Sequence, residues 1–524
     1  MEGKSDPTVS ENLQLCPLPL RRFLPMLRRV VFLFASAVAF APASRLQRRA
    51  VAPRFATNAR ARSPVPSPST APPADEVAAS MTELARREIA RARPPLAAED
   101  AWLAALDLEA FRRDVAALGE RLRRAQGADD LAHLRKMCRW SGGCLALGLL
   151  TLWLPPNPLT VLALSTHTYS RWAVIAHHVC HGGYHAGAAR DARGRFDAKR
   201  FAAGGVVRRA ADWLDWMLPE AWNVEHNHLH HYQLGEDGDP DLVERNLEFV
   251  HRNAKLPLRA RYALVGALAL VWKWFYYAPN TYKELKVAER RRDGEDVDAL
   301  DPDAPCTLKD FLPGAVERAR ARGKTLTRWF SLRELVARVI GPYFVARFAL
   351  LPAPLLLVPG RGARLFARAV ANLALAELLT NLHAFATIVT NHCGDDLYRF
   401  ETSCKPRSGT FYLRQVVSSA NYPAGPAQRA VPADAFDFAH GFLNYQVEHH
   451  LWPNLSALSY QRAHPELKAI CAKHGVPFVQ QSVPARLRKT IDVMVGKTSM
   501  RVFPRAYEHA PDLMTWRSDG AVSQ

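Results

Sequence analysis

The stretch that decides the fold runs from Met137 to His185 and reads MCRWSGGCLALGLLTLWLPPNPLTVLALSTHTYSRWAVIAHHVCHGGYH. Two apolar runs, residues 137–154 and 159–176, flank the turn Pro155-Pro156-Asn157-Pro158, where successive prolines end a helix. Each run approaches the roughly 20 residues that a membrane-spanning helix needs. The stretch therefore predicts a transmembrane hairpin with a histidine cluster at the end of its second span.

Histidine is concentrated in three clusters: HHVCHGGYH at residues 177–185, HNHLHH at 226–231 and QVEHH at 446–450. Imidazole is the commonest metal ligand in proteins near neutral pH. On a helix, residues three or four apart share a face, so His177 is expected to project with His181, and His226 with His230. The candidate ligands of the three clusters are His177, His181, His226, His230, His231, Gln446, His449 and His450.

The number of candidate ligands points to two metal ions. A structural zinc site is complete with four ligands and a catalytic one with three plus water, and the clusters offer more than either. Imidazole suits iron, zinc, copper and nickel, so these ligands alone do not choose the element. Three further histidines lie next to these regularly spaced ones: His178, His185 and His228. The sequence leaves three roles open for them, as further ligands, as hydrogen-bonding partners of ligands or as ordinary interfacial residues.

A second pair of apolar runs, residues 339–358 and 365–390, flanks the turn Pro359-Gly360-Arg361-Gly362. A fifth apolar stretch, residues 262–277, is rich in aromatic residues, which concentrate at membrane interfaces, so we expect it to lie along the surface. The chain then crosses the membrane an even number of times between the second and third clusters, so all three clusters lie on the same face of the membrane. The sequence predicts an all-α integral membrane protein: two transmembrane hairpins with four spans, interfacial helices and a helical cap that holds a di-metal site.

Composition excludes several other classes of protein. The 524 residues include 8 cysteines without a C-x-x-C pair, which argues against a disulfide scaffold or a cysteine zinc site. The formal net charge is +19, of which residues 1–74 contribute eleven basic and three acidic side chains, leaving +11 for the remainder. A basic surface suits an acidic redox partner or anionic lipid headgroups. Nucleic acid is not an expected partner, because no recognition module is present.

The N-terminal region has the composition of a targeting leader. Residues 1–39 have a signal-peptide layout, with arginines before a short apolar core that ends in Ala37-Val38-Ala39. Residues 40–75 are rich in Arg, Ala, Ser and Pro, like a plastid transit peptide, and the join ASAVAFAP resembles the bipartite leader of algae with complex plastids. We expect import into a plastid membrane; the alternative is a plain signal peptide followed by a disordered linker, with the protein in the endoplasmic reticulum membrane.

The rest of the chain divides into three parts. Residues 76–136 alternate Arg and Glu with Ala and Leu at helical spacing and are expected to form an amphipathic helical lead-in. Residues 137–480 hold both hairpins and all three clusters and form the expected catalytic domain, and residues 481–524 are the C-terminal tail.

The clusters and hairpins together resemble the membrane fatty acid desaturases. The motifs His177-x-x-x-His181, His226-x-x-x-His230-His231 and Gln446-x-x-His449-His450 are similar to the three histidine boxes of that family. The resemblance covers roughly residues 137–480 and is most specific at the boxes. It implies a non-haem di-iron centre on one membrane face above a four-helix membrane stem.

Two details refine the resemblance. The segment around Gln446 resembles the third box of front-end desaturases, in which glutamine, a weaker ligand with a neutral carbonyl oxygen, replaces the first histidine. Such enzymes often carry a fused cytochrome b5 domain with a His-Pro-Gly-Gly motif, which this chain lacks. The family also uses a histidine near the end of the last span. His392 occupies a comparable place, and His383, about half a turn out of phase with it, is the less favoured candidate.

The implied function is a membrane-bound acyl-lipid desaturase, which uses O2 and two iron ions to place a double bond in an acyl chain. Electrons are expected from an external ferredoxin or, if the chain stays in the secretory pathway, from a separate cytochrome b5. One alternative is a di-iron hydroxylase or ketolase that acts on a carotenoid or another hydrophobic substrate. The other is a non-catalytic metal-binding or transport protein with histidines along a permeation path, which is less favoured because the clusters lie beyond the span ends rather than along the spans.

Overall fold

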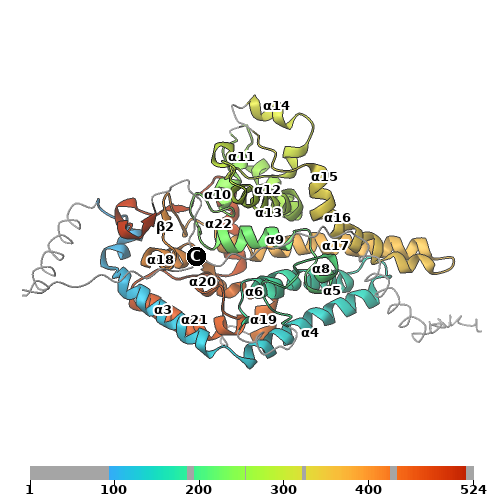
Figure 1. Cartoon of the computed structure of the whole chain (residues 1–524), viewed down its shortest axis with the longest axis horizontal. Coiled ribbons are helices and arrows are strands. Elements are labelled where there is room, and N and C mark those ends of the chain that lie inside the picture. Colours follow the sequence, from blue (N-terminus) through green and yellow to red (C-terminus); the bar gives the residue numbers. More distant parts are fainter. Residues whose placement is uncertain (1–93, 186–193, 254, 322–325, 425–432, 515–524) are drawn as a thin grey trace, which may run out of the picture. The chain divides into compact units, whose positions relative to one another are not determined.

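A computed structural model of the protein describes residues 94–185, 194–253, 255–321, 326–424 and 433–514. The two leader segments, residues 1–39 and 40–75, lie outside the described residues, as does the start of the helical lead-in. The described chain is mostly helical, with six two-residue strands (Figure 1). The predicted helical architecture is thereby confirmed, whereas the domain boundaries stay predictions.

The lead-in forms a 3-10 helix, η1 (Ala98–Ala105), and the amphipathic helix α3 (Leu108–Ala125). The Asp107 side chain caps α3 by accepting a hydrogen bond from the Ala110 amide at 2.9 Å. Phe111, Val115, Leu118 and Leu122 recur at helical spacing and are buried. The helix therefore packs one face against the rest of the protein, as the sequence predicts.

The first hairpin consists of α4 (Ala128–Thr151) and α5 (Pro158–Tyr169). Pro158 opens α5, and the Asn157 side chain caps it by accepting from the Thr160 amide. The chain continues without a break through the π-helical segment η2 (Ser170–Ala176) into α6 (His177–Cys180). The proline turn therefore lies where the sequence places it, and the second helix of the hairpin leads directly into the first histidine cluster.

Between the hairpins the chain forms a series of shorter helices. They are α8 (Val206–Asp212), α9 (Pro219–Trp222), the π-helical η3 (Asn223–His230), α10 (Val243–Asn246), α11 (Glu248–His251), α12 (Leu258–Trp272), η4 (Lys273–Tyr277), α13 (Ala278–Arg292), η5 (Asp298–Leu300), η6 (Leu308–Phe311) and α14 (Ala315–Arg320). The fifth apolar stretch forms part of one continuous helical segment from α12 through η4 to α13.

In the second hairpin, a first helical segment comprises α15 (Leu332–Leu335), η7 (Val336–Ile340), α16 (Gly341–Phe344), η8 (Val345–Leu350) and η9 (Ala353–Leu357). The return helix is α17 (Gly362–Thr387), followed by the 3-10 turn η10 (Val389–Asn391). Among the described residues, two helical segments are long and apolar enough to cross a membrane, Leu332–Leu357 and Gly362–Asn391. Length and composition thus support the second hairpin, and the total of four spans stays a prediction.

The C-terminal part carries the third histidine cluster. It contains β1 (Tyr398–Arg399), β2 (Ser403–Cys404), α18 (Gly409–Val417), β3 (Ala420–Asn421), α19 (Ala433–Ala439), η12 (Leu443–Tyr445), α20 (Gln446–Leu451), α21 (Ala457–Lys473), β4 (Val479–Gln480), α22 (Val483–Met494), β5 (Arg501–Val502), η13 (Arg505–Tyr507), η14 (Ala510–Asp512) and β6 (Leu513–Met514). The strands pair as β1–β5 and β3–β4 in parallel and β2–β6 antiparallel. The pairs β1–β5 and β2–β6 join residues after position 480 to the body of the protein.

One hydrophobic core connects the lead-in, the end of the first hairpin and the third histidine cluster. Its members include Phe111 of α3, Ile175 of η2 and Val447 of α20. In Figure 1, α6, α9 and α20 lie near the centre, and direct contacts between the histidines that they carry or adjoin confirm this proximity. The core thus positions the three clusters against one another.

Candidate metal centre

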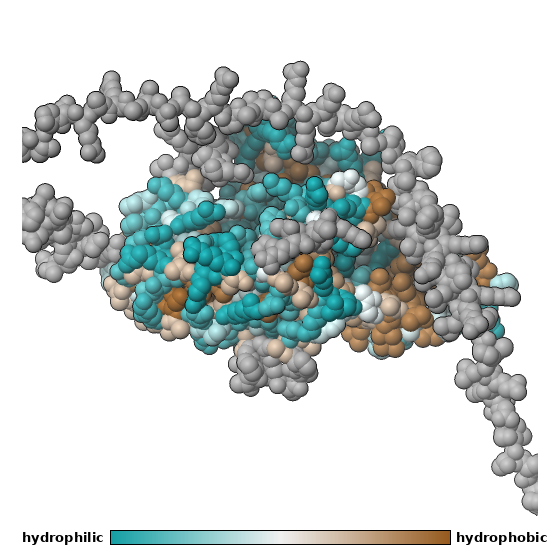
Figure 2. All heavy atoms as spheres, turned by 60° about the horizontal axis from the view of Figure 1, so that its bottom comes forward, coloured by the Kyte–Doolittle hydropathy of each residue, from teal (hydrophilic) through white to brown (hydrophobic). Residues whose placement is uncertain are grey.

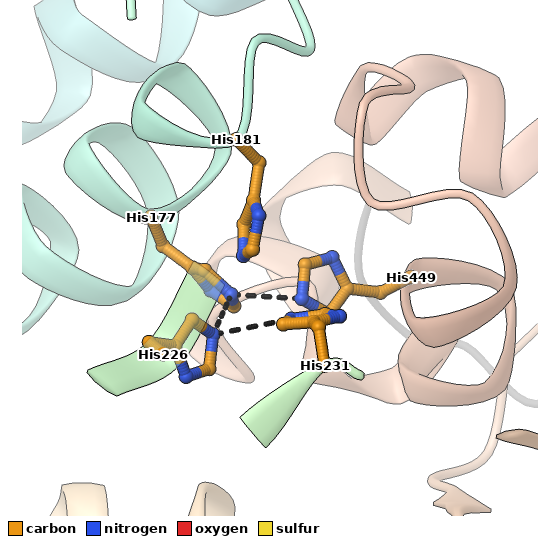
Figure 3. Close-up of side chains that lie close together, drawn as sticks. All are labelled: His177, His181, His226, His231 and His449. Atoms are coloured by element: carbon orange, nitrogen blue, oxygen red, sulfur yellow. Dashed lines mark hydrogen bonds between the residues drawn. The ribbon is translucent and has the colours of Figure 1, made fainter. Parts of the chain in front are cut away.

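Five histidines from the three clusters converge on one point: His177, His181, His226, His231 and His449 (Figure 3). One ring nitrogen from each lies within 4.8 Å of the others. His177 Nε2 is 2.9 Å from His449 Nε2 and 3.1 Å from His226 Nε2. We call this set the five-histidine group.

A second set, the three-histidine group, consists of His230, His392 and His450, whose ring nitrogens also lie within 4.8 Å of one another. It draws one member from each of the last two clusters and one from the end of the last helix. Gln446 adjoins it, because its Nε2 lies 2.7 Å from His392 Nε2. The structure therefore gathers all nine candidate ligands of the sequence analysis, in two neighbouring sets.

The second cluster contributes to both groups. His226 and His230, four residues apart, lie side by side as expected, with stacked rings whose centroids are 5.2 Å apart, and ring nitrogens of both lie near Asp241. Their other neighbours differ, because His226 joins the five-histidine group and His230 the three-histidine group. The reason is the π-helical conformation of η3, in which the His231 amide bonds to the His226 carbonyl five residues back. The wider turn aligns His226 with His231 and directs His230 to the other group. His177 and His181, in contrast, lie in the same group as expected.

Burial keeps most of these imidazoles neutral. Desolvation lowers the pKa of His177, His181, His226, His231, His449 and His450 well below the ordinary value of 6.5, and the neighbouring histidines lower it further. Burial also lowers the pKa of His392, to about 3. A neutral imidazole has a lone pair free for a metal ion, so both groups are prepared to bind cations at neutral pH.

His230 is the exception among the ligands. Burial acts to lower the pKa of its ring, but the Asp239 carboxylate outweighs burial and the pKa is raised. His230 Nδ1 donates to Asp239 Oδ1 at 2.9 Å, and both side chains are buried. This contact fixes the tautomer of His230 with Nε2 directed at the three-histidine group.

Other hydrogen bonds hold the remaining rings in place. His392 Nδ1 donates to the Ser418 carbonyl at 3.1 Å, and His449 Nδ1 lies 3.3 Å from the Tyr460 hydroxyl. Gln415 of α18 contacts both groups: its Oε1 lies 3.2 Å from His450 Nδ1, and its Nε2 donates to the His231 carbonyl. These supporting residues are not among those predicted from the sequence. The acidic residues that directly follow the second cluster could have indicated Asp239 as a partner of a ligand. No sequence pattern indicates Gln415.

Several polar atoms at the centre are left without protein partners. His181 Nε2, His450 Nε2 and Gln446 Oε1 are buried and have no hydrogen-bond partner within the described parts of the chain. A buried polar atom without a partner is costly, and a bound cation would satisfy all three. The neutral donor set and these atoms fit metal ions in both groups.

An apolar pocket adjoins both groups, with an empty volume of about 1200 Å³ that includes open space at its mouth. His177 and His226 of the five-histidine group line it, as do His230, His392 and Gln446. The rest of the lining includes Trp172, Trp222, Trp272, Phe275, Tyr276, Tyr277, Val265, Leu268, Phe385 and Ile388. The pocket suits a long apolar molecule that passes beside the metal centre.

Two carboxyl groups lie near the same wall. Burial raises the pKa of Glu225 well above its usual range, and Asp241 raises it further. Burial also raises the pKa of Asp241 to about 6. The Tyr277 hydroxyl donates to Glu225 Oε2 at 3.3 Å, and Asp241 lies within 4.8 Å of ring nitrogens of His226 and His230. These groups give the pocket a polar segment beside the histidines.

The remaining histidines lie outside the two groups. His178 Nδ1 donates to the Val174 carbonyl, His185 Nε2 accepts from the Ala198 amide, and His228 is exposed. His383 stacks on Tyr169 at 3.9 Å between ring centroids and donates to the Ala439 carbonyl. Of the two candidates near the end of the last helix, the structure therefore brings His392 and not His383 into the centre.

Fold and site together define a helical protein in which buried histidines that could hold metal ions lie beside an apolar pocket. The comparison with protein families identifies the class further, because the model described as "Fatty acid desaturase" matches residues 151–482. The chain belongs to the fatty acid desaturase family, a family of oxidoreductases. The family prediction made from the three boxes is confirmed.

Individual relatives match over shorter segments. The NADPH-dependent stearoyl-CoA 9-desaturase of Mycobacterium tuberculosis is 31% identical over 187 residues, which cover 35% of this chain and 40% of that protein. Fatty acid desaturase 3 of Bos taurus is 38% identical over 79 residues, or 15% of this chain and 17% of that protein. The chain thus spans two fifths or less of the length of these relatives. No solved structure matches it.

Proposed function

We propose that the protein is a membrane-bound fatty acyl desaturase with two iron ions, one in each histidine group. One observation carries the proposal: two sets of buried imidazoles, with partnerless atoms in both sets, border the same apolar pocket. Imidazole ligands alone do not select iron over other metals. Membership of the desaturase family supports iron rather than zinc or copper. The ligands would be the nine side chains already described, with Gln446 the weakest.

The proposed reaction removes two hydrogen atoms from adjacent carbons of an acyl chain. Dioxygen is reduced to two waters, and an external donor supplies the other two electrons, together with two protons. Bound iron supplies the oxygen-dependent oxidation that no side chain can perform. The protein's contribution is to hold one pair of methylenes beside the histidine groups, and the aromatic walls of the pocket, Trp172, Trp222 and Trp272, support that role.

We propose four membrane spans, with α4 and α5 as the first pair. Large apolar side chains on this hairpin are exposed, among them Leu150 at 65% and Leu162 at 55%, as are Phe344 and Leu357 of the second hairpin. Figure 2 shows hydrophobic surface gathered toward the side where α4, α5 and α17 lie in Figure 1. An apolar surface of this kind is costly in water and favourable in lipid. The helical segment around residues 262–277 would lie along the interface.

An acyl chain linked to a membrane lipid is the proposed substrate, because a pocket beside exposed apolar helices can take its substrate from the bilayer. The Mycobacterium relative is named for a coenzyme A thioester, which is the alternative acyl carrier. We propose a plastid membrane and a ferredoxin donor on the basis of the leader composition, with the endoplasmic reticulum and a separate cytochrome b5 as the alternative.

Expression of the chain without residues 1–75, together with a ferredoxin and its reductase, tests the proposal. Gas chromatography of total host lipids is expected to reveal an acyl chain with one additional double bond, whose position gives the regioselectivity. The His230→Ala and His449→Ala variants are the matched controls, and both are expected to lack the product; His230→Ala, which removes one of only three imidazoles from its group, should also lose one iron ion per chain. An unchanged profile with iron-loaded protein and a range of supplied acyl chains would contradict desaturation, and a hydroxylated product would indicate the hydroxylase alternative.

A further inference from the structure

Helix α18 lies beside both histidine groups. Gln415 on this helix contacts His450 and the His231 backbone, one residue from each group. Tyr412 of the same helix is half-buried, and Arg407, in the loop before the helix, is exposed. The helix therefore extends from the histidine groups to the surface of the protein.

Aromatic rings connect this surface with the second histidine cluster. Tyr232 directly follows the candidate ligand His231 and is 43% exposed. Its ring centroid lies 6.2 Å from that of Phe411, and the Phe411 centroid lies 5.9 Å from that of Tyr412. The three rings form a continuous row that starts beside the candidate ligand His231 and ends at the half-buried Tyr412.

Basic side chains surround this row of rings. Burial raises the pKa of the Tyr412 phenol, and the charges of Arg407, Arg112 and Arg123 act against that rise, so all three lie within electrostatic range of its hydroxyl. Helix α3, which carries Arg112 and Arg123, contains five arginines and three carboxylates. The surface around Tyr412 therefore has an excess of positive charge, although Arg112 and Arg123 also pair with glutamates of their own helix.

The packing of α3 fixes these arginines relative to the centre. Gly119 of α3 lies against the Trp452 indole so closely that a β-carbon there would be 2.2 Å from its Nε1 atom. Trp452 is buried and follows the candidate ligands His449 and His450 by two or three residues. The basic helix is thus seated directly on the third cluster, and it cannot shift without disturbing that contact.

We propose that this surface, the α18 face (Tyr232, Phe411, Tyr412, Arg112, Arg123 and Arg407), is the docking site of an acidic one-electron carrier protein. The inference rests on the proposed function, which needs two electrons from outside. Electron transfer falls off steeply with distance, so a donor must dock near the histidine groups, and the arginines would attract an acidic partner. Contacts of this kind are small and transient and depend on salt.

Binding of the oxidised carrier tests the site without any turnover. The iron-loaded full chain in lipid nanodiscs is immobilised, and biolayer interferometry measures its affinity for an acidic ferredoxin, for an acidic cytochrome b5 domain and for a basic one-electron carrier. We expect at least one acidic carrier to bind and the basic one not to bind. Arg407→Glu should weaken binding about fivefold, and Arg123→Glu/Arg407→Glu at least about tenfold. Arg320→Glu in α14, which Figure 1 draws far from α18, is the matched control and should have no effect.

A second measurement separates docking from chemistry. Desaturation is driven either by the carrier or by dithionite with a small neutral mediator. The double variant should lose the carrier-driven rate and keep the chemically driven rate. Wild-type affinity in the double variant, an equal loss in Arg320→Glu, or an equal fall of both rates would overturn the docking site. No product from the wild type with the chemical reductant would refute the desaturase proposal, while the binding measurements would still decide the docking site.

Discussion

The five-histidine group and the three-histidine group are neighbours, yet the chain builds them from different numbers of side chains. The larger group has five imidazoles, all with a lowered pKa. The smaller group has three imidazoles and the amide of Gln446, and one of its imidazoles is tied to a carboxylate. A set with surplus ligands tolerates the loss of one member, whereas a set at the minimum does not. We therefore expect the two metal positions to differ in affinity, pH dependence and sensitivity to mutation.

Removal of one ligand from each group gives the largest expected effect. His450→Ala leaves two imidazoles and Gln446, so we expect the loss of one iron per chain and of all measurable desaturation. His181→Ala leaves four imidazoles, a complete set for one ion, so this variant should retain most of its iron even though the activity falls. Iron per chain, measured by elemental analysis after gel filtration, checks both outcomes. Equal iron loss in the two variants would refute the unequal assignment.

Removal of a hydrogen bond that orients a ligand also tests the difference between the two groups. Asp239→Asn weakens the acceptor that orients His230, and such changes typically lower metal affinity about 10- to 100-fold. Tyr460→Phe removes the hydroxyl that lies 3.3 Å from His449 Nδ1, a neutral and longer contact, so its effect should be smaller. Titration of the metal-free protein with Fe(II) in the absence of oxygen measures both affinities. A larger loss in Tyr460→Phe than in Asp239→Asn would contradict the proposed role of the carboxylate.

Acidification should release the two ions at different pH values. An imidazole binds a metal ion only while the coordinating nitrogen is unprotonated, and a proton competes for His230 first because its pKa is raised above 6.5. The ligands of the five-histidine group have lowered pKa values, so protons compete for them only at lower pH. As the pH falls, the three-histidine group should therefore lose its ion first.

Dialysis of the iron-loaded protein against a chelator between pH 7.5 and 5 checks this order. Iron per chain should pass through a plateau near one, because the two groups should release their ions in separate steps. Far-UV circular dichroism must stay constant over this range, so that release is not caused by unfolding. Simultaneous loss of both ions from folded protein would show that the groups do not differ in this way.

The sequence alone predicts much of this architecture because its strongest signals are local. The prolines around Asn157 define the turn of the first hairpin, and the spacing within the three clusters is enough to name eight of the nine candidate ligands. The prediction of His392 rests on the family resemblance, which implies a ligand near the end of the last span, while the half-turn offset from His383 argues only against both histidines facing one metal ion. The total number of spans remains a prediction, since α4 and α5 carry charged and polar residues that weaken a signal based on composition.

The division of the ligands between two groups could not be read from the sequence. A period of 3.6 residues pairs His226 with His230, but η3 is π-helical, and its register depends on tertiary contacts rather than on local propensity. Gln415 contacts both groups, although more than 150 residues separate it from His231 in the sequence. No local sequence pattern predicts a contact over such a separation. The local signals thus identify which residues take part, and long-range packing decides what each one does.

Substitution of Gln446 should have the smallest effect on iron binding, and it tests directly whether this residue is a ligand. Its Nε2 lies 2.7 Å from His392 Nε2, and its Oε1 has no partner in the described chain, so the amide fills a ligand position without a strong donor. Gln446→His replaces that amide with an imidazole of similar length, and we expect the iron affinity of the three-histidine group to rise severalfold, by up to about 1 kcal/mol. In the pH titration, the first step should move to lower pH while the second stays unchanged. Gln446→Leu, which is similar in volume but has no donor, should shift the first step in the opposite direction. If neither substitution moves the first step, Gln446 is not a ligand and serves only to orient His392.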